Sequence, residues 1–254
     1  MSCRRRDMTE VYWLEQAGTD VPAGSDWLSE GEALRLSQMR FPKRLADWRL
    51  GRWTGKCALA AFLRHPLDLP HLAQIEIIPS PEGAPEAFVD GRRTAATISL
   101  SHRAGLAVCA VASSSVALGC DLEIIEPRSD SFVTDYFTAE EQTLIARMPI
   151  ADQPRLLALL WSAKESTLKA LGIGLRADTR SVMVRPDSEW TGGLQVADIS
   201  PAWQALHVRC IDDQVFHGWW QETGKLMRTL IAAPPPTVPL RLHAFPEALL
   251  QART

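Results

Sequence analysis

The sequence contains no long apolar segment and little net charge. No run approaches the ~20 apolar residues needed to span a bilayer. The basic stretch within residues 1–10 is not followed by the apolar core of a secretory signal. A net charge of −3 over 254 residues is too small to indicate nucleic-acid or membrane binding. These absences predict a globular cytoplasmic protein without nucleic-acid or membrane partners.

Cysteines are few and scattered. The chain has five, an odd number with no C-x-x-C spacing: Cys3, Cys57, Cys109, Cys120 and Cys210. This pattern does not indicate a disulfide framework or a cysteine-based zinc site, and no activating neighbour marks a catalytic thiol. The sequence therefore predicts reduced, mostly buried thiols.

Two carboxylates stand two residues apart in the segment G-C-D-L-E, residues 119–123. The small and β-branched residues before it favour a strand, in which Asp121 and Glu123 share one face. Adjacent like charges repel, so a buried strand would need a compensating cation, and oxygen ligands suit a hard ion such as Mg²⁺. The same pattern also occurs at strand edges that face water.

Charged residues recur on two predicted helices. The helix over residues 153–171 carries Trp161, Glu165 and Lys169 at i, i+4 and i+8, and its Glu–Lys pair is also ordinary helix-surface chemistry. The helix over residues 42–64 carries a basic stripe formed by Arg49, Arg52 and Lys56. That stripe is typical of a solvated face and also suits an anion cradle. His102 ends the predicted strand over residues 97–102, where it could donate to a phosphate.

The ordered segments GRWTGKCALAAFL, ISLSH, GCDLE, YFTAEE and WSAKESTLKALGIGL resemble a 4′-phosphopantetheinyl transferase of the larger, Sfp-like branch. The resemblance covers roughly residues 40–180. It implies an α+β fold of two similar α+β subdomains related by a pseudo-twofold axis, in a monomeric chain. The expected subdomains are residues 1–115, which bind the nucleotide end and phosphates, and 116–254, which carry the metal and catalytic motifs. A Pro-rich tail follows from about residue 233.

The resemblance also implies roles for individual residues. The implied ligands of Mg²⁺, with Mn²⁺ as an alternative, are Asp121, Glu123 and Glu165. The implied catalytic residues are Glu165 and Lys169. The implied contacts to coenzyme A are Arg49, Arg52, Lys56, Ser101, His102, Lys164 and Lys169. Ile173 departs from the family pattern, which often has Lys there, and this puts a carrier or phosphate contact in doubt.

The reaction implied is transfer of the 4′-phosphopantetheine arm from coenzyme A to a serine of an apo acyl or peptidyl carrier protein. Glu165 or a metal-bound water would accept the serine proton. Carriers are typically acidic, and candidate basic residues for contacting one are Arg147, Arg155, Arg176 and Arg180. Two alternatives remain open: a non-catalytic relative that binds coenzyme A or carriers, and a Mg²⁺-dependent hydrolase of nucleotide pyrophosphates.

Overall fold

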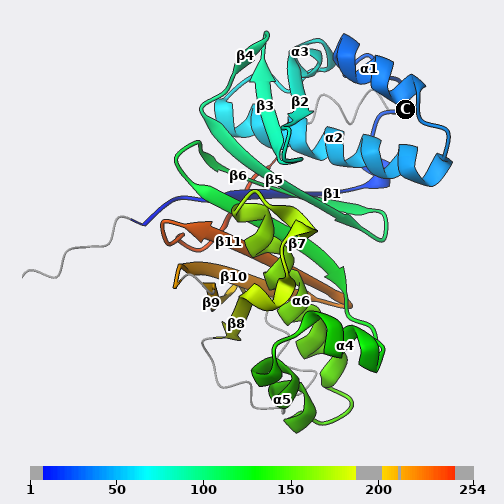
Figure 1. The fold of residues 1–254 in the computed structure, drawn as a ribbon. Coiled ribbons are helices and arrows are strands. Elements are labelled where there is room, and N and C mark those ends of the chain that lie inside the picture. The colour runs from blue at the N-terminus through cyan, green and yellow to red at the C-terminus, as the bar shows by residue number, and fades with distance from the viewer. Residues whose placement is uncertain (1–7, 187–201, 211–212, 244–254) are drawn as a thin grey trace, which may run out of the picture. The chain divides into compact units, whose positions relative to one another are not determined.

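The computed structural model describes residues 8–186, 202–210 and 213–243, drawn as a coloured ribbon in Figure 1. The described chain divides into two compact units. The N-terminal unit contains residues 11–115 and 240–243, and the C-terminal unit contains 8–10 and the described part of 116–239. Both units pack helices on mainly antiparallel strands, so the predicted α+β class is confirmed. Among the described residues, no helix is long and apolar enough to cross a membrane.

The N-terminal unit is organised around helix α2, which packs on strands β1, β5 and β6. One sheet has the strand order β12-β1-β6-β5, and a second has the order β2-β3-β4. The strands are β1 (Tyr12–Ala17), β2 (Ile75–Pro79), β3 (Pro85–Val89), β4 (Arg92–Arg93), β5 (Ala96–Arg103), β6 (Leu106–Ser113) and β12 (Leu240–Arg241). The helices are α1 (Glu30–Ser37), α2 (Pro42–Leu63) and α3 (Leu69–Gln74), with a 3₁₀ turn at Gly18–Asp20.

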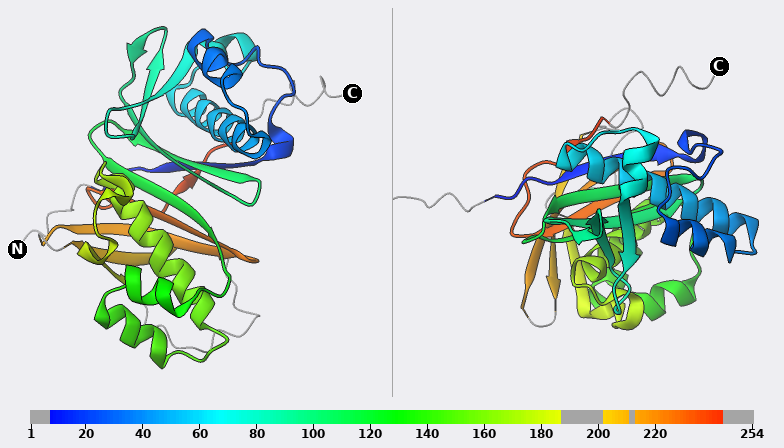
Figure 2. Two further views of the ribbon diagram at one scale, coloured as in Figure 1. Left: turned by 45° about the vertical axis from the view of Figure 1, so that its right-hand side comes forward. Right: turned by 90° about the horizontal axis from the view of Figure 1, so that it is seen from above.

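The C-terminal unit consists of a five-stranded sheet, in the order β7-β11-β10-β9-β8, with helix α6 packed mainly on β7 and β11. Figure 2 shows α6 lying over this sheet. The strands are β7 (Ala117–Ile124), β8 (Val182–Pro186), β9 (Gln204–Cys210), β10 (Val215–Thr223) and β11 (Leu226–Ala233). The helices are α4 (Asp130–Tyr136), α5 (Ala139–Arg147) and α6 (Gln153–Ala170), followed by 3₁₀ turns at Gly174–Arg176 and Thr179–Ser181.

The two units repeat one element order. Each begins with a strand (β1 or β7), continues through a short capped helix (α1 or α5) and a long helix (α2 or α6), and ends with a hairpin (β5–β6 or β10–β11). In each unit the last strand pairs with both the first strand and its hairpin partner. The expected similarity of two subdomains is therefore visible in their topology.

Local sequence signals account for the helix boundaries. Capping boxes begin α1, through Ser29 and Glu32, and α5, through Thr138 and Glu141. Gly172, at φ 72°, follows α6 in the left-handed conformation that ends many helices. The segment 129–137 has a mixed composition typical of a loop, yet residues 130–136 form α4 behind a Ser129 N-cap.

The start of the Pro-rich tail is held within the C-terminal unit. Thr9 N donates to Pro235 O at 3.0 Å, and Thr237 N donates to Thr9 O at 2.9 Å. The indole nitrogen of Trp219 donates to Pro236 O at 3.3 Å. Residues 235–237 of the tail are thus hydrogen-bonded to Thr9 and to Trp219 of β10. Residues 244–254 lie outside the described residues.

Candidate functional site

A glycine sets the distance between strand β7 and helix α6. A Cβ at Gly119 would lie 1.7 Å from the carbonyl oxygen of Ser166 and 2.9 Å from the backbone nitrogen of Ala170. No other residue type leaves room for the helix backbone at this point. The face of β7 that carries Gly119 also carries Asp121 and Glu123, because side chains alternate along a strand. The glycine therefore brings the last turns of α6 over both carboxylates.

Lys169, on α6, bonds directly to the strand. Its Nζ donates to Asp121 Oδ1 at 2.8 Å and to the carbonyl oxygen of Cys120 at 3.0 Å, and it lies 4.0 Å from Glu165 Oε2. The Asp121 side chain is only 2% exposed, whereas that of Lys169 is 28% exposed. Burial alone would lower the pKa of Lys169, but Asp121 and its other anionic neighbours raise it above the ordinary value. Lys169 therefore stays protonated.

Glu165 completes what we call the carboxylate cluster: Asp121, Glu123 and Glu165. Burial, followed by the negative charge of Asp121, raises the pKa of Glu165 to about 7, and Glu123 adds to the effect although Lys169 opposes it. The charges of Asp121 and Glu123 on β7 therefore both act on Glu165 of α6. The predicted meeting of strand and helix is thus present, and it is held within one unit.

Arg128 contacts the outer end of the cluster, and sequence reasoning missed it. Its Nη2 lies 3.1 Å from Glu123 Oε2, and its Nη1 lies 3.4 Å from Glu126 Oε1. Its guanidinium carbon lies 5.2 Å from the centroid of the Phe132 ring, on α4. The sequence signal was a basic residue directly after the acidic strand.

The donor set of the cluster suits a hard divalent cation. All three side chains are carboxylates, which is the chemistry that Mg²⁺ and Mn²⁺ prefer. Burial and then the charge of Asp121 raise the pKa of Glu165, and Lys169 opposes this effect. Within the described residues, no three potential ligands are arranged around a common point as a ready-made metal site. Lys169 instead supplies the positive charge at Asp121 in this structure.

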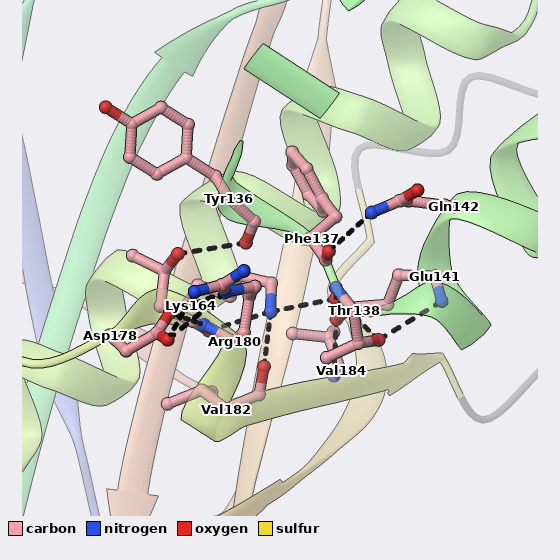
Figure 3. Close-up of polar contacts among 11 residues, drawn as sticks. Tyr136, Phe137, Thr138, Glu141, Gln142, Lys164, Asp178, Arg180, Val182 and Val184 are labelled. Carbon is pink, nitrogen blue, oxygen red and sulfur yellow. Dashed lines mark hydrogen bonds and ion pairs between the residues drawn. The ribbon is translucent and has the colours of Figure 1, made fainter. Parts of the chain in front are cut away.

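Lys164, adjacent to Glu165 in sequence, belongs to the protein core. Its side chain is fully buried, and its Nζ lies 2.8 Å from Glu141 Oε2 and donates to the carbonyl oxygens of Thr179 and Val182 (Figure 3). Glu141 Oε1 in turn accepts a hydrogen bond from Val184 N at 3.1 Å. We call this arrangement the C-terminal clamp. The expectation that Lys164 contacts coenzyme A does not hold for this arrangement, because all its donors face the interior.

The N-terminal unit contains the same arrangement, which we call the N-terminal clamp. Lys56 Nζ lies 2.5 Å from Glu32 Oε2 and donates to the carbonyl oxygens of Trp27 and Leu72, and Glu32 Oε1 accepts a hydrogen bond from Ile77 N at 3.1 Å. Lys56 is fully buried. The expected role of Lys56 in binding the nucleotide end is therefore corrected, since its ammonium group is enclosed by protein.

Arg49 and Arg52 do not form an open basic stripe with Lys56. Arg49 donates to Ser25 Oγ at 3.0 Å and to the carbonyl oxygen of Gly24 at 2.7 Å, and so holds the loop before α1. Arg52 is mostly buried, with its Nε 3.7 Å from Glu32 Oε1 and its guanidinium 5.2 Å from the Trp48 ring centroid. Burial lowers the pKa of both arginines.

The two clamps share a lysine but differ in the residues that follow it. Both long helices carry the pattern W-x-x-K, at Trp53 to Lys56 and at Trp161 to Lys164. The residue after the lysine is Cys57 in α2, which is buried, and Glu165 in α6. Five residues after the lysine, α2 has an alanine where α6 has Lys169. The shared lysines are therefore structural, whereas Glu165 and Lys169 have no counterpart in the N-terminal unit.

His102 lies in an open groove within the N-terminal unit. The groove has a volume of about 540 Å³ and is lined by Phe41, Lys43, Arg44, Asp47, Trp48 and His102. His102 is exposed near the end of β5, and its neighbour Ser101 is half-buried. The two cations come from the first turn of α2, which sequence reasoning did not single out. The signal available was the run R-F-P-K-R at residues 40–44.

The residues proposed to contact a carrier, and Ile173, are placed as follows. Arg155 pairs with Glu222, and Arg180 pairs with Asp178 at 2.9 Å. Arg147 lies in the last turn of α5, and Arg176 lies in the 3₁₀ turn after α6. Ile173 is 41% exposed directly beyond α6.

Known proteins are similar to this chain in the region that contains β7 and α6. Residues 117–217 match the model of the 4′-phosphopantetheinyl transferase superfamily. The chain is 27% identical over 197 residues to the 4′-phosphopantetheinyl transferase HetI of Nostoc sp. (strain PCC 7120), covering 77% of this chain and 79% of that protein. It is 28% identical over 133 residues to a Synechocystis sp. (strain PCC 6803) protein named "putative 4′-phosphopantetheinyl transferase", covering 51% of this chain and 52% of that protein. The matched region contains β7, α6 and the carboxylate cluster, so these elements lie in the part of the chain that is similar to the 4′-phosphopantetheinyl transferase superfamily.

Proposed function

We propose that this protein transfers the 4′-phosphopantetheine arm of coenzyme A to a serine of an apo carrier protein, with a divalent cation, Mg²⁺ or Mn²⁺, held by Asp121, Glu123 and Glu165. The observation that carries the proposal is the carboxylate cluster, in which β7 and α6 bring three carboxylates and Lys169 together inside the segment that matches the family. The repeated element order of the two units supports membership of the larger, single-chain branch.

In the proposed reaction, the serine oxygen of the carrier forms a bond to the β-phosphorus of coenzyme A. The bond from that phosphorus to the oxygen of the nucleotide part breaks, and adenosine 3′,5′-bisphosphate leaves with the bonding electron pair. A bound divalent cation supplies charge neutralisation at the pyrophosphate. Lys169, which stays protonated, provides a charge-assisted donor beside the cluster.

Glu165 is the candidate acceptor for the serine proton. Without a metal, burial and then the charge of Asp121 raise the pKa of Glu165 to about 7, and a bound divalent cation would lower it so that the carboxylate is ionised and able to accept a proton. Its side chain is 20% exposed, so solvent reaches it, whereas Asp121 is almost enclosed. We therefore assign proton transfer to Glu165, directly or through a water, and not to Asp121.

The groove at His102 is proposed to bind an anionic group of coenzyme A. Lys43 and Arg44 give it two permanent positive charges against the single carboxylate of Asp47, and His102 adds a donor. Trp48 supplies an aromatic wall on which a base could stack. This assignment replaces Arg49 and Lys56, whose polar groups bond to the protein itself, and Arg52, whose Nε lies 3.7 Å from Glu32 Oε1 in a mostly buried position.

A transfer assay tests the function. The protein is incubated with coenzyme A, Mg²⁺ and apo carriers of the fatty acid, polyketide and nonribosomal peptide types, and each carrier is weighed by intact-protein mass spectrometry. The expected result is a carrier heavier by one phosphopantetheine arm, with equimolar bisphosphate release. Bisphosphate release without any carrier would favour the hydrolase alternative. Coenzyme A binding without turnover on any carrier would favour a non-catalytic relative.

A further inference from the structure

A buried lysine–glutamate clamp occurs in both units, so the role of Lys164 can be judged against that of Lys56. Burying an ammonium and a carboxylate costs free energy that their attraction does not always recover, so such pairs are weak evidence for stability alone. A buried pair does, however, fix the positions of the elements that carry it. The C-terminal clamp lies one residue from Glu165, whereas the N-terminal clamp lies next to the buried Cys57.

The C-terminal clamp ties the middle of α6 to three other elements. Lys164 reaches Glu141 in the first turn of α5, the Thr179 carbonyl in the 3₁₀ turn, and the Val182 carbonyl at the start of β8. Glu141 also accepts hydrogen bonds from Thr138 and from Val184 N, and the Lys164 ammonium lies 5.7 Å from the Phe137 ring centroid (Figure 3). Every bond of the Lys164 ammonium is therefore to a fixed backbone carbonyl or to a carboxylate that is itself fixed.

This clamp restrains the helix rotation that places Glu165. Residues 164 and 165 are separated by about 100° around a helix, so a helix held at Lys164 cannot turn Glu165 away from β7 without breaking the clamp. On the other side, Gly119 fixes how closely α6 approaches β7. Together the two contacts set both the rotation and the distance of the helix that carries the third carboxylate.

We propose that Glu141 and Lys164 are positioning residues that hold Glu165 in the carboxylate cluster and so set its affinity for a divalent cation. The proposal rests on the proposed metal-binding role of that cluster. Residues that orient metal ligands without touching the metal typically change metal affinity by about 10–100-fold when they are replaced. The N-terminal clamp is the control, because it buries the same lysine–glutamate pair, with Arg52 Nε also 3.7 Å from Glu32 Oε1, and has no neighbour that is proposed to bind metal.

The test compares Lys164→Met with Lys56→Met in the full chain. Mn²⁺ binding is measured by calorimetry with the metal alone, without coenzyme A or carrier, and thermal melting is recorded for each variant. Both substitutions leave a buried glutamate without its ammonium partner, so both are expected to lower the melting temperature. Only Lys164→Met is expected to weaken Mn²⁺ binding, by about tenfold or more, while Lys56→Met stays within about twofold of wild type.

A second variant covers the case in which Lys164→Met does not fold. Glu141→Gln combined with Lys164→Met removes both charges and retains an amide oxygen that can accept from Val184 N. This double variant is expected to fold and to bind Mn²⁺ about fivefold more weakly than wild type, or worse. Wild-type affinity in the double variant or in folded Lys164→Met, or equal losses in the Lys56 and Lys164 variants, would overturn the positioning role. Failure of the wild-type protein to bind Mn²⁺ would instead overturn the metal-binding role itself.

Discussion

Substitution of Gly119 by alanine tests whether the close approach of β7 and α6 builds the carboxylate cluster. The added Cβ would lie 1.7 Å from Ser166 O, and ordinary contact begins at 3.4 Å, so α6 or β7 must shift by roughly 1.7 Å. The opposing atoms belong to the helix backbone, including Ala170 N at 2.9 Å. No side-chain rotation can therefore relieve the clash.

The expected cost follows from this geometry. Inserting a methyl group into a well-packed interior costs about 1–3 kcal/mol, and the rigid backbone opposite places Gly119→Ala at the upper end of that range. For a chain of this length, about 3 kcal/mol lowers the melting temperature by roughly 6–12 °C. The shift also carries Glu165 and Lys169 away from Asp121, and a displacement of about 1 Å in a catalytic group can cost ~10²-fold in rate.

The assay pairs thermal melting with the transfer rate. The control is Gly51→Ala in the N-terminal unit, where a Cβ would meet nothing within 4 Å. Alanine favours a helix over glycine by about 1 kcal/mol, so this control should melt at or above the wild-type temperature and retain its rate. If Gly119→Ala melts with the wild type and transfers within about twofold of its rate, glycine is not what places α6 on β7.

Three further predictions concern single side chains. Because the folded-state pKa of Glu165 is about 7 against an ordinary 4.5, the metal-free protein loses stability as pH rises through that window. Glu165→Gln should remove this loss of stability and should stabilise the metal-free protein at pH 8 by about 2 kcal/mol, measured by urea unfolding. The same substitution should abolish transfer. An unchanged pH dependence of stability would contradict this prediction. Burial raises the pKa of Cys57 to about 12, so iodoacetamide should leave Cys57 unmodified in the native protein at pH 8, and peptide mapping that finds it alkylated would refute the assignment. His102→Ala should raise the KM for coenzyme A about tenfold with kcat nearly unchanged, and a loss confined to kcat would remove His102 from coenzyme A binding.

Features that depend on local sequence were predictable. Strand alternation places Asp121 and Glu123 on one face of β7, and the two capping boxes mark the starts of α1 and α5. The contact between β7 and α6 was less accessible from local patterns. It depends on Gly119 having no side chain, and a sequence pattern shows this position only as a small residue. The family resemblance, rather than spacing, indicated that Glu165 joins the strand carboxylates.

The basic residues show where spacing arguments fail. Arg49, Arg52 and Lys56 share a helical stripe, but spacing does not reveal that Glu32, on another helix, lies within 2.5 Å of Lys56. Lys164 is concealed in the same way by Glu141. In both cases the signal was present as a capping-box glutamate, whose Oε2 accepts from the N-cap residue and also pairs with the lysine. Reading each capping box as a partner for a buried lysine would have separated scaffold lysines from Lys169.

The most direct test of the account is the metal dependence of transfer by the wild-type protein and by Asp121→Asn. We predict that chelation stops transfer by the wild-type protein and that added Mg²⁺ restores it. We also predict that Asp121→Asn, with the fold retained by circular dichroism, transfers nothing at any Mg²⁺ concentration. Transfer at the wild-type rate by Asp121→Asn, or undiminished wild-type transfer in excess chelator, would contradict the assignment of the carboxylate cluster as the catalytic metal site.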